Sequence, residues 1–334
     1  MNSLLRRAAS TCLMPLAARA AQTYIAGPTL GGALRVATGL AEQGFATTLG
    51  FWDGADDTPG SVCAEYLAAL DALGRKNHDS YLSIKLPALG HSSALLQHVT
   101  ERARSAVAGA ERGSDVPTMT ASRFAGKLLA SHGETHPLES ASAVALADID
   151  EATTERTVRP LRIHFDSLAP EAADAMWSAA VEAAEGGANV SCSLPGRWRR
   201  SLEDADAAVE AGIVPRVVKG QWPDADDPQA DLRIGFMQVI TRLAGRAPHV
   251  AVASHDVPLA QKAIERLRAS GTTCELELLY GLPQRASLAL AARENVPVRF
   301  YVPYGKAYLP YCLGQARRRP QLLWWLLRDA LLRC

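Results

Sequence analysis

The sequence lacks an excess of charge of either sign. Its 334 residues include 35 Lys and Arg, which balance 35 Asp and Glu. A neutral chain has no bulk field that would draw it to nucleic acid or to an anionic membrane, so neither partner is expected. The sequence also lacks a run of about 18 apolar residues, the length that a transmembrane helix needs. At 48% apolar and 21% charged residues, the chain has the composition of an ordinary globular protein.

Cysteine pairs at metal-binding spacing and glycine-rich nucleotide motifs are absent as well. The six cysteines, at positions 12, 63, 192, 274, 312 and 334, form no C-x-x-C pair and have no companion His at metal spacing. We therefore expect no metal site, and we expect reduced cysteines that act as small apolar residues. No G-x-G-x-x-G motif is present, so the glycine spacing does not predict a Rossmann domain.

The first 22 residues are predicted to form an N-terminal helical arm. Residues 1–21 carry arginine and many alanines but no acid, which is also typical of a targeting segment. Pro15 and Arg19 interrupt the apolar run, and the segment continues directly into a periodic pattern at Tyr24. We favour the helical arm and keep a targeting segment as the alternative. The expected location is the cytoplasm, and peripheral association with a membrane stays open.

Apolar runs of strand length recur through the rest of the chain, between stretches with helical periodicity. The predicted strands are Phe45–Phe51, Tyr81–Leu86, Leu161–Phe165, Ala188–Leu194, Ile213–Val218, Val250–Ala253, Cys274–Leu279 and Val298–Val302. Alternation of strand and helix implies a parallel sheet with right-handed crossovers. Eight such units predict an α/β protein with one closed (β/α)₈ barrel over residues 23–334.

Two intervening segments illustrate the helical pattern, and one departs from it. Apolar residues at helical spacing precede Gly212 and Gly271, which predicts a helix before each glycine. About eighty residues separate the second strand from the third, far more than one helix requires. The extra material, near 113–139, is rich in Ser, Thr, Gly and His. We interpret it as a solvated insertion, with a lid over the barrel mouth as the alternative.

Polar residues follow several predicted strands, where the loops of such a barrel converge on the active site. Lys85 and Lys219 follow β-branched apolar runs and are expected at the top of the barrel, with Asp166 and His255 at other strand ends. Two lysines, an aspartate and a histidine in one mouth suit an anionic ligand, such as a cofactor that bears phosphate.

Motifs in order along residues 23–333 resemble the proline dehydrogenase family. The C-terminal segment contains V-R-F-Y-V-P-Y-G at 298–305, close to the last barrel strand of that family. Earlier matches are Y-I-A-G-P-T-L at 24–30, S-I-K-L at 83–86, H-F-D at 164–166, R-V-V-K-G-Q-W at 216–222, A-S-H-D at 253–256 and C-E-L-E-L-L-Y-G at 274–281. The resemblance implies a flavin-dependent barrel that binds FAD.

The resemblance also implies roles for single residues. Lys85 would hold the substrate carboxylate, Asp166 would be the active-site acid, and Tyr301 would contact the substrate; these three are the predicted catalytic residues. Arg216 would hydrogen-bond the flavin N5 region, where a cation stabilises negative charge. The predicted cofactor-binding residues are Arg216, Val218, Lys219, Gly220, Gln221, Ser254, His255 and Glu277.

The sequence departs from the family where the family contacts substrate. Gly314 and Gln315 stand where two arginines clamp a carboxylate, and each lost charge-assisted contact is worth about 1.5–3 kcal/mol. Arg318, one helical turn later, either recovers part of the anion site or belongs to an exposed basic face. The predicted substrate-pocket residues are Trp222, Tyr308, Gly314, Gln315 and Arg318.

Two further departures affect the flavin contacts and leave two functions open. Pro195 replaces a glutamine that would bond the flavin, and Asp256 replaces an asparagine. We expect hydride transfer to FAD from a C–N bond of an amine or modified amino acid other than free proline. Quinone or oxygen would take up the electrons. The alternative is a non-redox or binding-only barrel that has lost flavin chemistry.

Overall fold

Eight parallel strands form a closed barrel in the computed structural model, which describes residues 26–76, 78–105, 161–167, 169–224 and 226–307. Neighbouring strands pair in chain order, and β8 pairs back onto β1. The strands are β1 (Ala46–Phe51), β2 (Ser80–Ile84), β3 (Arg162–Phe165), β4 (Asn189–Pro195), β5 (Val214–Val218), β6 (His249–Ala253), β7 (Thr273–Leu279) and β8 (Val298–Tyr304). The predicted (β/α)₈ barrel is confirmed.

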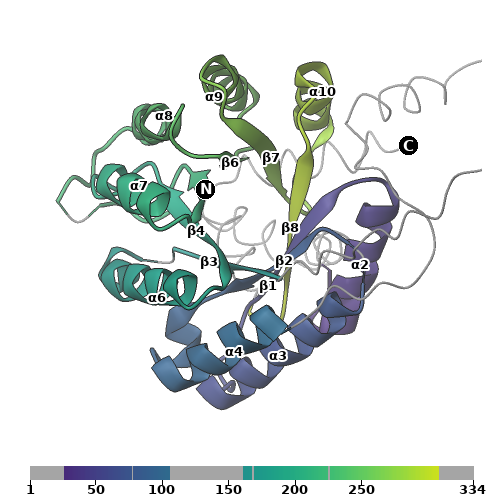
Figure 1. The fold of residues 1–334 in the computed structure, drawn as a ribbon. Coiled ribbons are helices and arrows are strands. Elements are labelled where there is room, and N and C mark those ends of the chain that lie inside the picture. The colour runs from purple at the N-terminus through teal and green to yellow at the C-terminus, as the bar shows by residue number, and fades with distance from the viewer. Residues whose placement is uncertain (1–25, 77, 106–160, 168, 225, 308–334) are drawn as a thin grey trace, which may run out of the picture.

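Helices surround the barrel on the outside of the strands (Figure 1). The α-helices are α2 (Leu30–Glu42), α3 (Pro59–Gly74), α4 (Ser93–Ser105), α6 (Ala173–Glu185), α7 (Ser201–Glu210), α8 (Leu232–Leu243), α9 (Val257–Ala269) and α10 (Arg285–Glu294). Two short 3₁₀ helices, η1 (Leu86–Leu89) and η2 (Pro170–Ala172), follow β2 and β3. The helices predicted before Gly212 and Gly271 are α7 and α9. None of the helices in the described ranges is long and apolar enough to cross a membrane.

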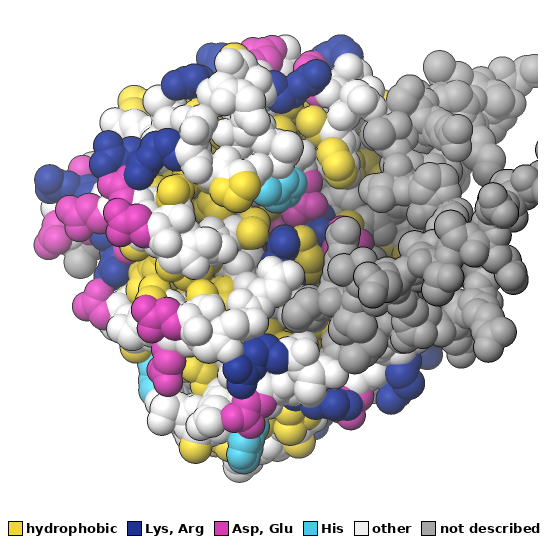
Figure 2. All heavy atoms as spheres, viewed as in Figure 1, with side chains coloured by type: hydrophobic (Ala, Val, Ile, Leu, Met, Phe, Trp, Pro, Cys, Tyr) yellow, Lys and Arg dark blue, Asp and Glu magenta, His cyan; other side chains and the backbone are white. Residues whose placement is uncertain are grey.

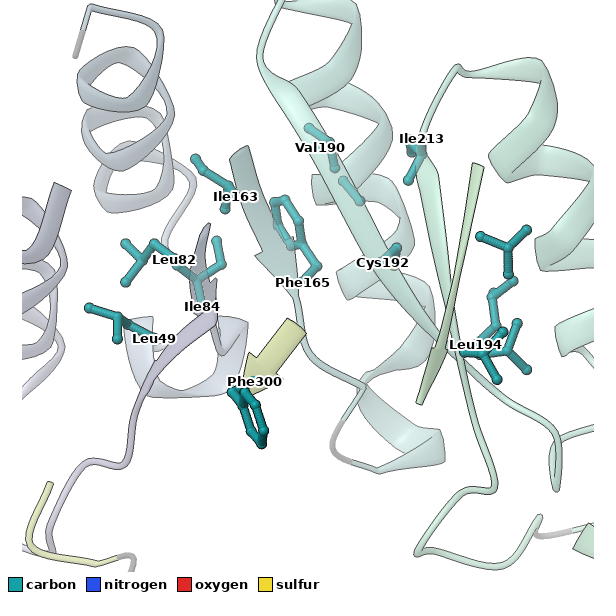
Figure 3. Packing of buried hydrophobic residues seen from close by; sticks show 14 of the residues in the cluster. Leu49, Leu82, Ile84, Ile163, Phe165, Val190, Cys192, Leu194, Ile213 and Phe300 are labelled. Carbon is teal, nitrogen blue, oxygen red and sulfur yellow. The ribbon is translucent and has the colours of Figure 1, made fainter. Parts of the chain in front are cut away.

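Strand alternation separates an apolar layer from a polar interior. On β3, Ile163 and Phe165 are fully buried and belong to the apolar core between strands and helices, as Figure 3 shows for this and neighbouring strands. Full burial of such side chains contributes about 1.5–3 kcal/mol each. His164, between them in sequence, points to the other face because side chains alternate along a strand.

The interior of the barrel is therefore unusually polar. Contacts across the barrel join its side chains, such as those of Arg216 on β5 with Asp166 beyond β3 and with Glu277 on β7. The buried or nearly buried interior polar residues are Ser83, Lys85, His164, Asp166, Ser191, Ser193, Arg216, Glu275, Glu277, Arg299 and Tyr301. A charged interior requires its charges to be paired, so it positions side chains more strictly than an apolar one.

Strand ends differ slightly from those predicted. β2 ends at Ile84 instead of Leu86, because Leu86 and Pro87 begin η1 and proline favours the first turn of a helix. β8 continues past Val302 to Tyr304, whose carbonyl accepts a hydrogen bond from Trp52 N at 2.8 Å. The predicted N-terminal arm (1–22), the insertion near 113–139 and the C-terminal helix lie outside the described residues.

Candidate active site at the carboxyl ends of the strands

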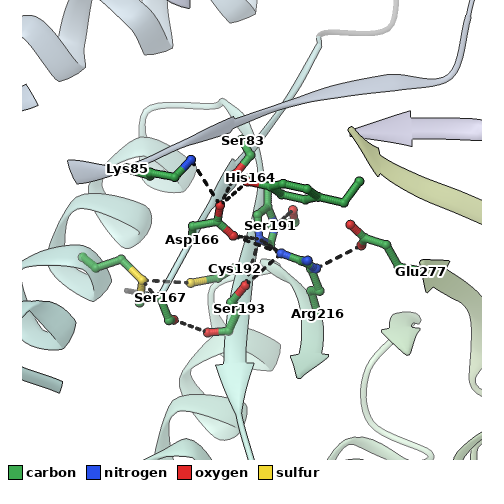
Figure 4. Close-up of polar contacts among 12 residues, drawn as sticks. Ser83, Lys85, His164, Asp166, Ser167, Ser191, Cys192, Ser193, Arg216 and Glu277 are labelled. Atoms are coloured by element: carbon green, nitrogen blue, oxygen red, sulfur yellow. Dashed lines mark hydrogen bonds and ion pairs between the residues drawn. The ribbon is translucent and has the colours of Figure 1, made fainter. Parts of the chain in front are cut away.

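Six interior side chains form a connected polar cluster toward the carboxyl ends of the strands, and Figure 4 labels all of them except Tyr301. We call it the upper cluster; it consists of Lys85, His164, Asp166, Arg216, Glu277 and Tyr301. Figure 2 shows His, acidic and basic side chains gathered near the middle of the face viewed in Figure 1, with apolar side chains beside them. The three predicted catalytic residues thus lie together, with two of the predicted cofactor-binding residues.

Asp166 is the centre of the upper cluster. Its Oδ2 accepts hydrogen bonds from Ser83 Oγ at 2.6 Å and from Tyr301 OH at 2.7 Å, and its Oδ1 accepts one from Arg216 Nη1 at 3.0 Å. Burial alone would raise the pKa of Asp166, but contact with His164 and the charges of Lys85 and Arg216 hold that pKa well below its usual range. Asp166 is therefore an ionised anchor at neutral pH.

Lys85 reaches Asp166 from the end of β2. Its Nζ lies 3.7 Å from Asp166 Oδ2, donates to the Phe51 carbonyl oxygen at 2.7 Å, and lies 4.9 Å from the centre of the Trp52 ring. Only 2% of the residue is exposed, and this burial lowers the pKa of Lys85, although Asp166 opposes the shift. The ammonium is held by one carboxylate, one carbonyl and one aromatic face.

Arg216 lies between two carboxylates. Besides its bond to Asp166, its Nε lies 3.1 Å from Glu277 Oε2, and its guanidinium carbon lies 5.0 Å from the centre of the Tyr301 ring. Burial opposes the charge of Arg216, but Glu277 and Asp166 raise its pKa above the usual value. Burial has the opposite consequence for Glu277, because it raises the pKa of that carboxyl to about 6 despite Arg216.

His164 completes the cluster and is the residue that the sequence did not reveal. Its Nδ1 lies 2.7 Å from Ser191 Oγ, and its Nε2 lies 2.9 Å from Ser193 Oγ and 3.0 Å from Arg216 Nη1. Burial lowers the pKa of His164 to about 4, so the ring is neutral at pH 7. The available signal was its position two residues before Asp166, on the same face of β3.

Tyr301 occupies space that a glycine on β1 leaves open. A Cβ atom added at Gly50 would lie 2.1 Å from the Tyr301 hydroxyl oxygen, closer than atoms can approach. Because Gly50 carries no side chain, the phenol can cross the barrel interior and donate to Asp166. This pair explains why β1 carries glycine within an otherwise apolar and β-branched run.

Lys219 follows β5 and is one of the predicted cofactor-binding residues. In the structure it contacts an acid in the loop after β6. Lys219 Nζ lies 3.8 Å from Asp256 Oδ2, and Arg233 Nη2 lies 2.6 Å from the same oxygen. Asp256 also caps α9 by accepting from Leu259 N at 3.4 Å. Gly220 has φ +89, a left-handed conformation that suits glycine.

His255 and Ser254 make hydrogen bonds within the chain. His255 Nδ1 lies 3.1 Å from the Pro283 carbonyl oxygen, and its Nε2 accepts from Leu279 N at 2.8 Å. Burial lowers the pKa of His255, in keeping with a neutral ring. Ser254 Oγ accepts from Asp256 N at 3.1 Å. These contacts fix the loops after β6 and β7, and a ligand role for either side chain stays a prediction.

The remaining predicted residues are only partly described. Trp222 is 43% exposed, and its carbonyl oxygen accepts a hydrogen bond from Trp198 Nε1 at 3.0 Å. Val218 ends β5, and Gln221 follows Gly220 in the same loop. The other predicted pocket residues lie outside the described residues; they are Tyr308, Gly314, Gln315 and Arg318. Within the described ranges, no group of three or more His, Cys, Asp or Glu residues could hold a metal ion.

Comparison with known proteins supports the fold. No protein-family model and no curated protein match the sequence. Among solved structures, proline utilization A (PutA) from Bdellovibrio bacteriovorus inactivated by N-propargylglycine aligns over 89% of this chain, with 14% identity and a TM-score of 0.61. PutA from Corynebacterium freiburgense aligns over 95%, with 15% identity and a TM-score of 0.56. This chain spans about a third of each of those proteins, 32% and 33% respectively. The similarity shows a shared barrel fold.

Proposed function

We propose that this protein is an FAD-dependent oxidoreductase that takes hydride from a C–N bond of an amine or modified amino acid other than free proline. The observation that carries the proposal is the nearly buried Arg216 guanidinium, which extends from the middle of β5 and is held by Asp166 and Glu277. Arg216 occupies the position to which the family resemblance assigns the flavin N5 contact. The shared fold with PutA structures supports the same assignment.

The residues at the ring end of the proposed site fit a flavin. Glu277 Oε1 is buried and has no hydrogen-bond partner among the described residues, which leaves a polar atom that a heterocyclic ligand could satisfy. Arg216 Nε is also buried and makes no hydrogen bond within the described part of the chain, although it lies 3.1 Å from Glu277 Oε2 as an ion pair. A cation and a hydrogen-bonding carboxyl side by side match the polar edge of an isoalloxazine ring.

At the other end of the proposed site, a cation and a glycine turn lie together. Lys219 is 37% exposed at its side chain and precedes Gly220, whose backbone would supply a donor. Lys219 and Arg233 would meet phosphate by exchanging their contact with Asp256 for one with the cofactor. In this proposal Val218, Gln221, Ser254 and His255 line the same turn region.

Bound FAD would supply the hydride acceptor. The chain would contribute fixed charge: Asp166 and neutral His164 hold the Arg216 guanidinium, which would stabilise the negative charge that develops on the flavin. Lys85 would hold an anionic or electron-rich group of the substrate, and Tyr301 would contact the substrate body. A preorganised cation of this kind needs little rearrangement during the reaction.

Free proline is proposed to be at best a very poor substrate. Gly314 and Gln315 cannot clamp a carboxylate, and Lys85 alone is a point charge without bidentate geometry. Trp222, Gln221 and Gln315 would instead offer an aromatic wall and amide hydrogen bonds, which suit a larger or less anionic substrate. We propose quinone or oxygen as the electron acceptor and the cytoplasm as the location, with peripheral contact to a membrane left open.

The first test is whether the purified protein binds flavin. Protein purified with excess FAD should retain an absorbance band at about 450 nm, characteristic of bound flavin. Arg216→Met should shift the reduction potential of the bound flavin downward, because the cation no longer stabilises the reduced ring. Protein that retains no flavin would refute the assignment.

The substrate is tested by anaerobic bleaching of the bound flavin with a panel of amines that includes proline. Some amine should bleach it, and proline should do so far more slowly than about 1 s⁻¹, a typical enzymatic rate. Proline oxidation at that rate would refute the proposed substrate class. Restoring Gly314→Arg and Gln315→Arg together should increase the response to proline.

A second candidate function is a binding-only barrel without flavin. It is favoured by contacts already made within the chain: Asp256 pairs with Lys219 and Arg233, and both His255 nitrogens contact the backbone. Pro195 also offers no side-chain donor. This candidate predicts that neither FAD nor any amine produces a flavin signal, so the absorbance measurement separates the two.

A further inference from the structure

Arg216 is held from two sides by unequal partners. On one side, Nη1 contacts Asp166 at 3.0 Å, His164 at 3.0 Å and Ser193 at 3.3 Å. On the other side, the contact is the ion pair of Nε with Glu277 Oε2 at 3.1 Å. Asp166 is in turn bound by Ser83, Tyr301 and Lys85, so its side of the site is firmly fixed. The Glu277 side depends on one pair of atoms.

The second oxygen of Glu277 weakens that pair further. Oε1 is buried and has no hydrogen-bond partner in the described part of the chain. An ionised carboxylate needs several donors when it is removed from water, and an unmade bond costs about 1–3 kcal/mol. Protonation removes much of this cost. Burial accordingly raises the pKa of Glu277 to about 6, although Arg216 favours the ionised form.

Among the described residues, Arg216 is the cation in direct contact with Glu277. On β8, Arg299 is bound by Glu275 Oε1 and Asp79 Oδ2, both at 2.9 Å, and Tyr301 is a phenol. On β7 itself, Glu275 is a second acid. Beyond β3, Asp166 adds a third negative charge; Lys85 approaches its Oδ2, and neutral His164 lies beside its Oδ1 and Arg216 Nη1. On β6, the residue in register is uncharged Ala253.

We infer that Glu277 is a proton-linked competitor for Arg216, so that an anionic ligand group binds the guanidinium as Glu277 takes up one proton. The proton comes from solvent, and the ligand anion replaces the carboxylate, which leaves the net charge of the site unchanged. The ligand chemistry is a carboxylate or a negatively charged flavin ring. The flavin source rests on the proposed function, whereas the carboxylate source does not.

The affinity of Arg216 for an anionic ligand should therefore depend on pH. Ionised Glu277 competes with the anion above pH about 6, so the apparent Kd of an anionic probe should rise about tenfold per pH unit there. From pH 6 to pH 8 the loss of affinity is about a hundredfold. Glu277→Gln keeps the size of the side chain and cannot ionise, so its anion affinity should be nearly independent of pH over this range.

The experiment measures proton uptake directly with benzoate and with reduced FAD as probes. Calorimetric titration at pH 8 in two buffers of different ionisation enthalpy gives the number of protons taken up per probe bound. We expect about one more proton for wild type than for Glu277→Gln. The matched control Glu265→Gln removes a carboxylate from the exposed face of α9 and should behave as wild type.

Every outcome decides the inference. Equal proton uptake by wild type and Glu277→Gln would overturn it, as would failure of both probes to bind at pH 6. If Glu277→Gln does not fold, wild type with benzoate alone decides, because benzoate carries no titrating group at pH 8. Oxidised FAD is a separate arm: its failure to bind refutes the proposed function, while the benzoate result still tests Glu277.

Discussion

Two arginines inside the same barrel differ in how completely they are paired. Arg299, toward the amino ends of the strands, donates from Nε to Glu275, from Nη1 to the Thr47 carbonyl oxygen and from Nη2 to Asp79, each at 2.9 Å. Its guanidinium carbon also lies 3.6 Å from the centre of the Tyr81 ring. We call Arg299, Glu275, Asp79 and Tyr81 the lower cluster. Arg216, in the upper cluster, retains an unmatched neighbour in Glu277 Oε1.

The pKa values of the two acids on β7 reflect this difference in pairing. Glu275 and Glu277 are two residues apart on the same face of one strand, and both are buried. Burial would raise both pKa values, but Arg299 and His249 lower the pKa of Glu275 to about 2, whereas that of Glu277 rises to about 6. A saturated ion pair stabilises the barrel, and an unsaturated one keeps a titratable group ready for a ligand. We interpret the lower cluster as structural and the upper cluster as functional.

The largest expected effect comes from Arg299→Met. It leaves Glu275 buried without its main counter-charge, and loss of one partner of a buried pair costs about 3–5 kcal/mol of unfolding free energy. Arg216→Met should cost less, because Glu277 can become protonated and Asp166 keeps Lys85, Ser83 and Tyr301. Urea unfolding of both variants at pH 7 measures the difference. Equal losses would remove the distinction between the two clusters.

The second prediction concerns the pH dependence of stability, which should have opposite signs for the two acids. The folded-state pKa of Glu277 is raised, so the folded form binds more protons and stability falls as pH rises from about 4.5 to about 6. A shift of that size corresponds to about 2 kcal/mol. The folded-state pKa of Glu275 is depressed, so its contribution is present above about 4.5 and is lost as pH falls toward 2.

Substitution at each acid tests these signs. At pH 7.5, Glu277→Gln should raise the unfolding free energy by about 1–2 kcal/mol relative to wild type, and this gain should vanish at pH 4.5. Glu275→Gln should instead lower it by about 2–3 kcal/mol at pH 7.5. Urea titrations at the two pH values provide the measurement. A gain for Glu277→Gln that is the same at both pH values would contradict the assigned pKa.

The barrel was predictable from sequence because strand-length apolar runs are a local property. All eight predicted strands overlap observed ones, and the order of strand and helix fixes the topology. Which side chains pair with one another inside the barrel was less predictable. The pairing of Arg216 with Glu277 depends on contacts across the interior, between strands that are not neighbours. His164 was missed because polar residues were sought at strand ends, and it lies one position inside β3.

The smallest expected effect compares two tyrosines, one from each cluster. Tyr301→Phe removes the hydroxyl that donates to Asp166 at 2.7 Å and should cost about 1 kcal/mol, since Asp166 keeps Ser83 and Arg216. Tyr81→Phe removes a hydroxyl that accepts from Arg162 but keeps the ring beneath Arg299, so its cost should be similar or smaller. Stability alone therefore does not separate the two variants.

Ligand binding should separate them. Tyr301→Phe weakens the fixation of Asp166 and, through it, of Arg216, so the benzoate affinity at pH 6 should change severalfold. Tyr81→Phe lies in the lower cluster, and its benzoate affinity should equal that of wild type. Calorimetric titration of both variants makes the comparison. If Tyr81→Phe altered the affinity as much as Tyr301→Phe, the two clusters would be one coupled network, because Glu275 shares a strand with Glu277 and its charge raises the pKa of Glu277.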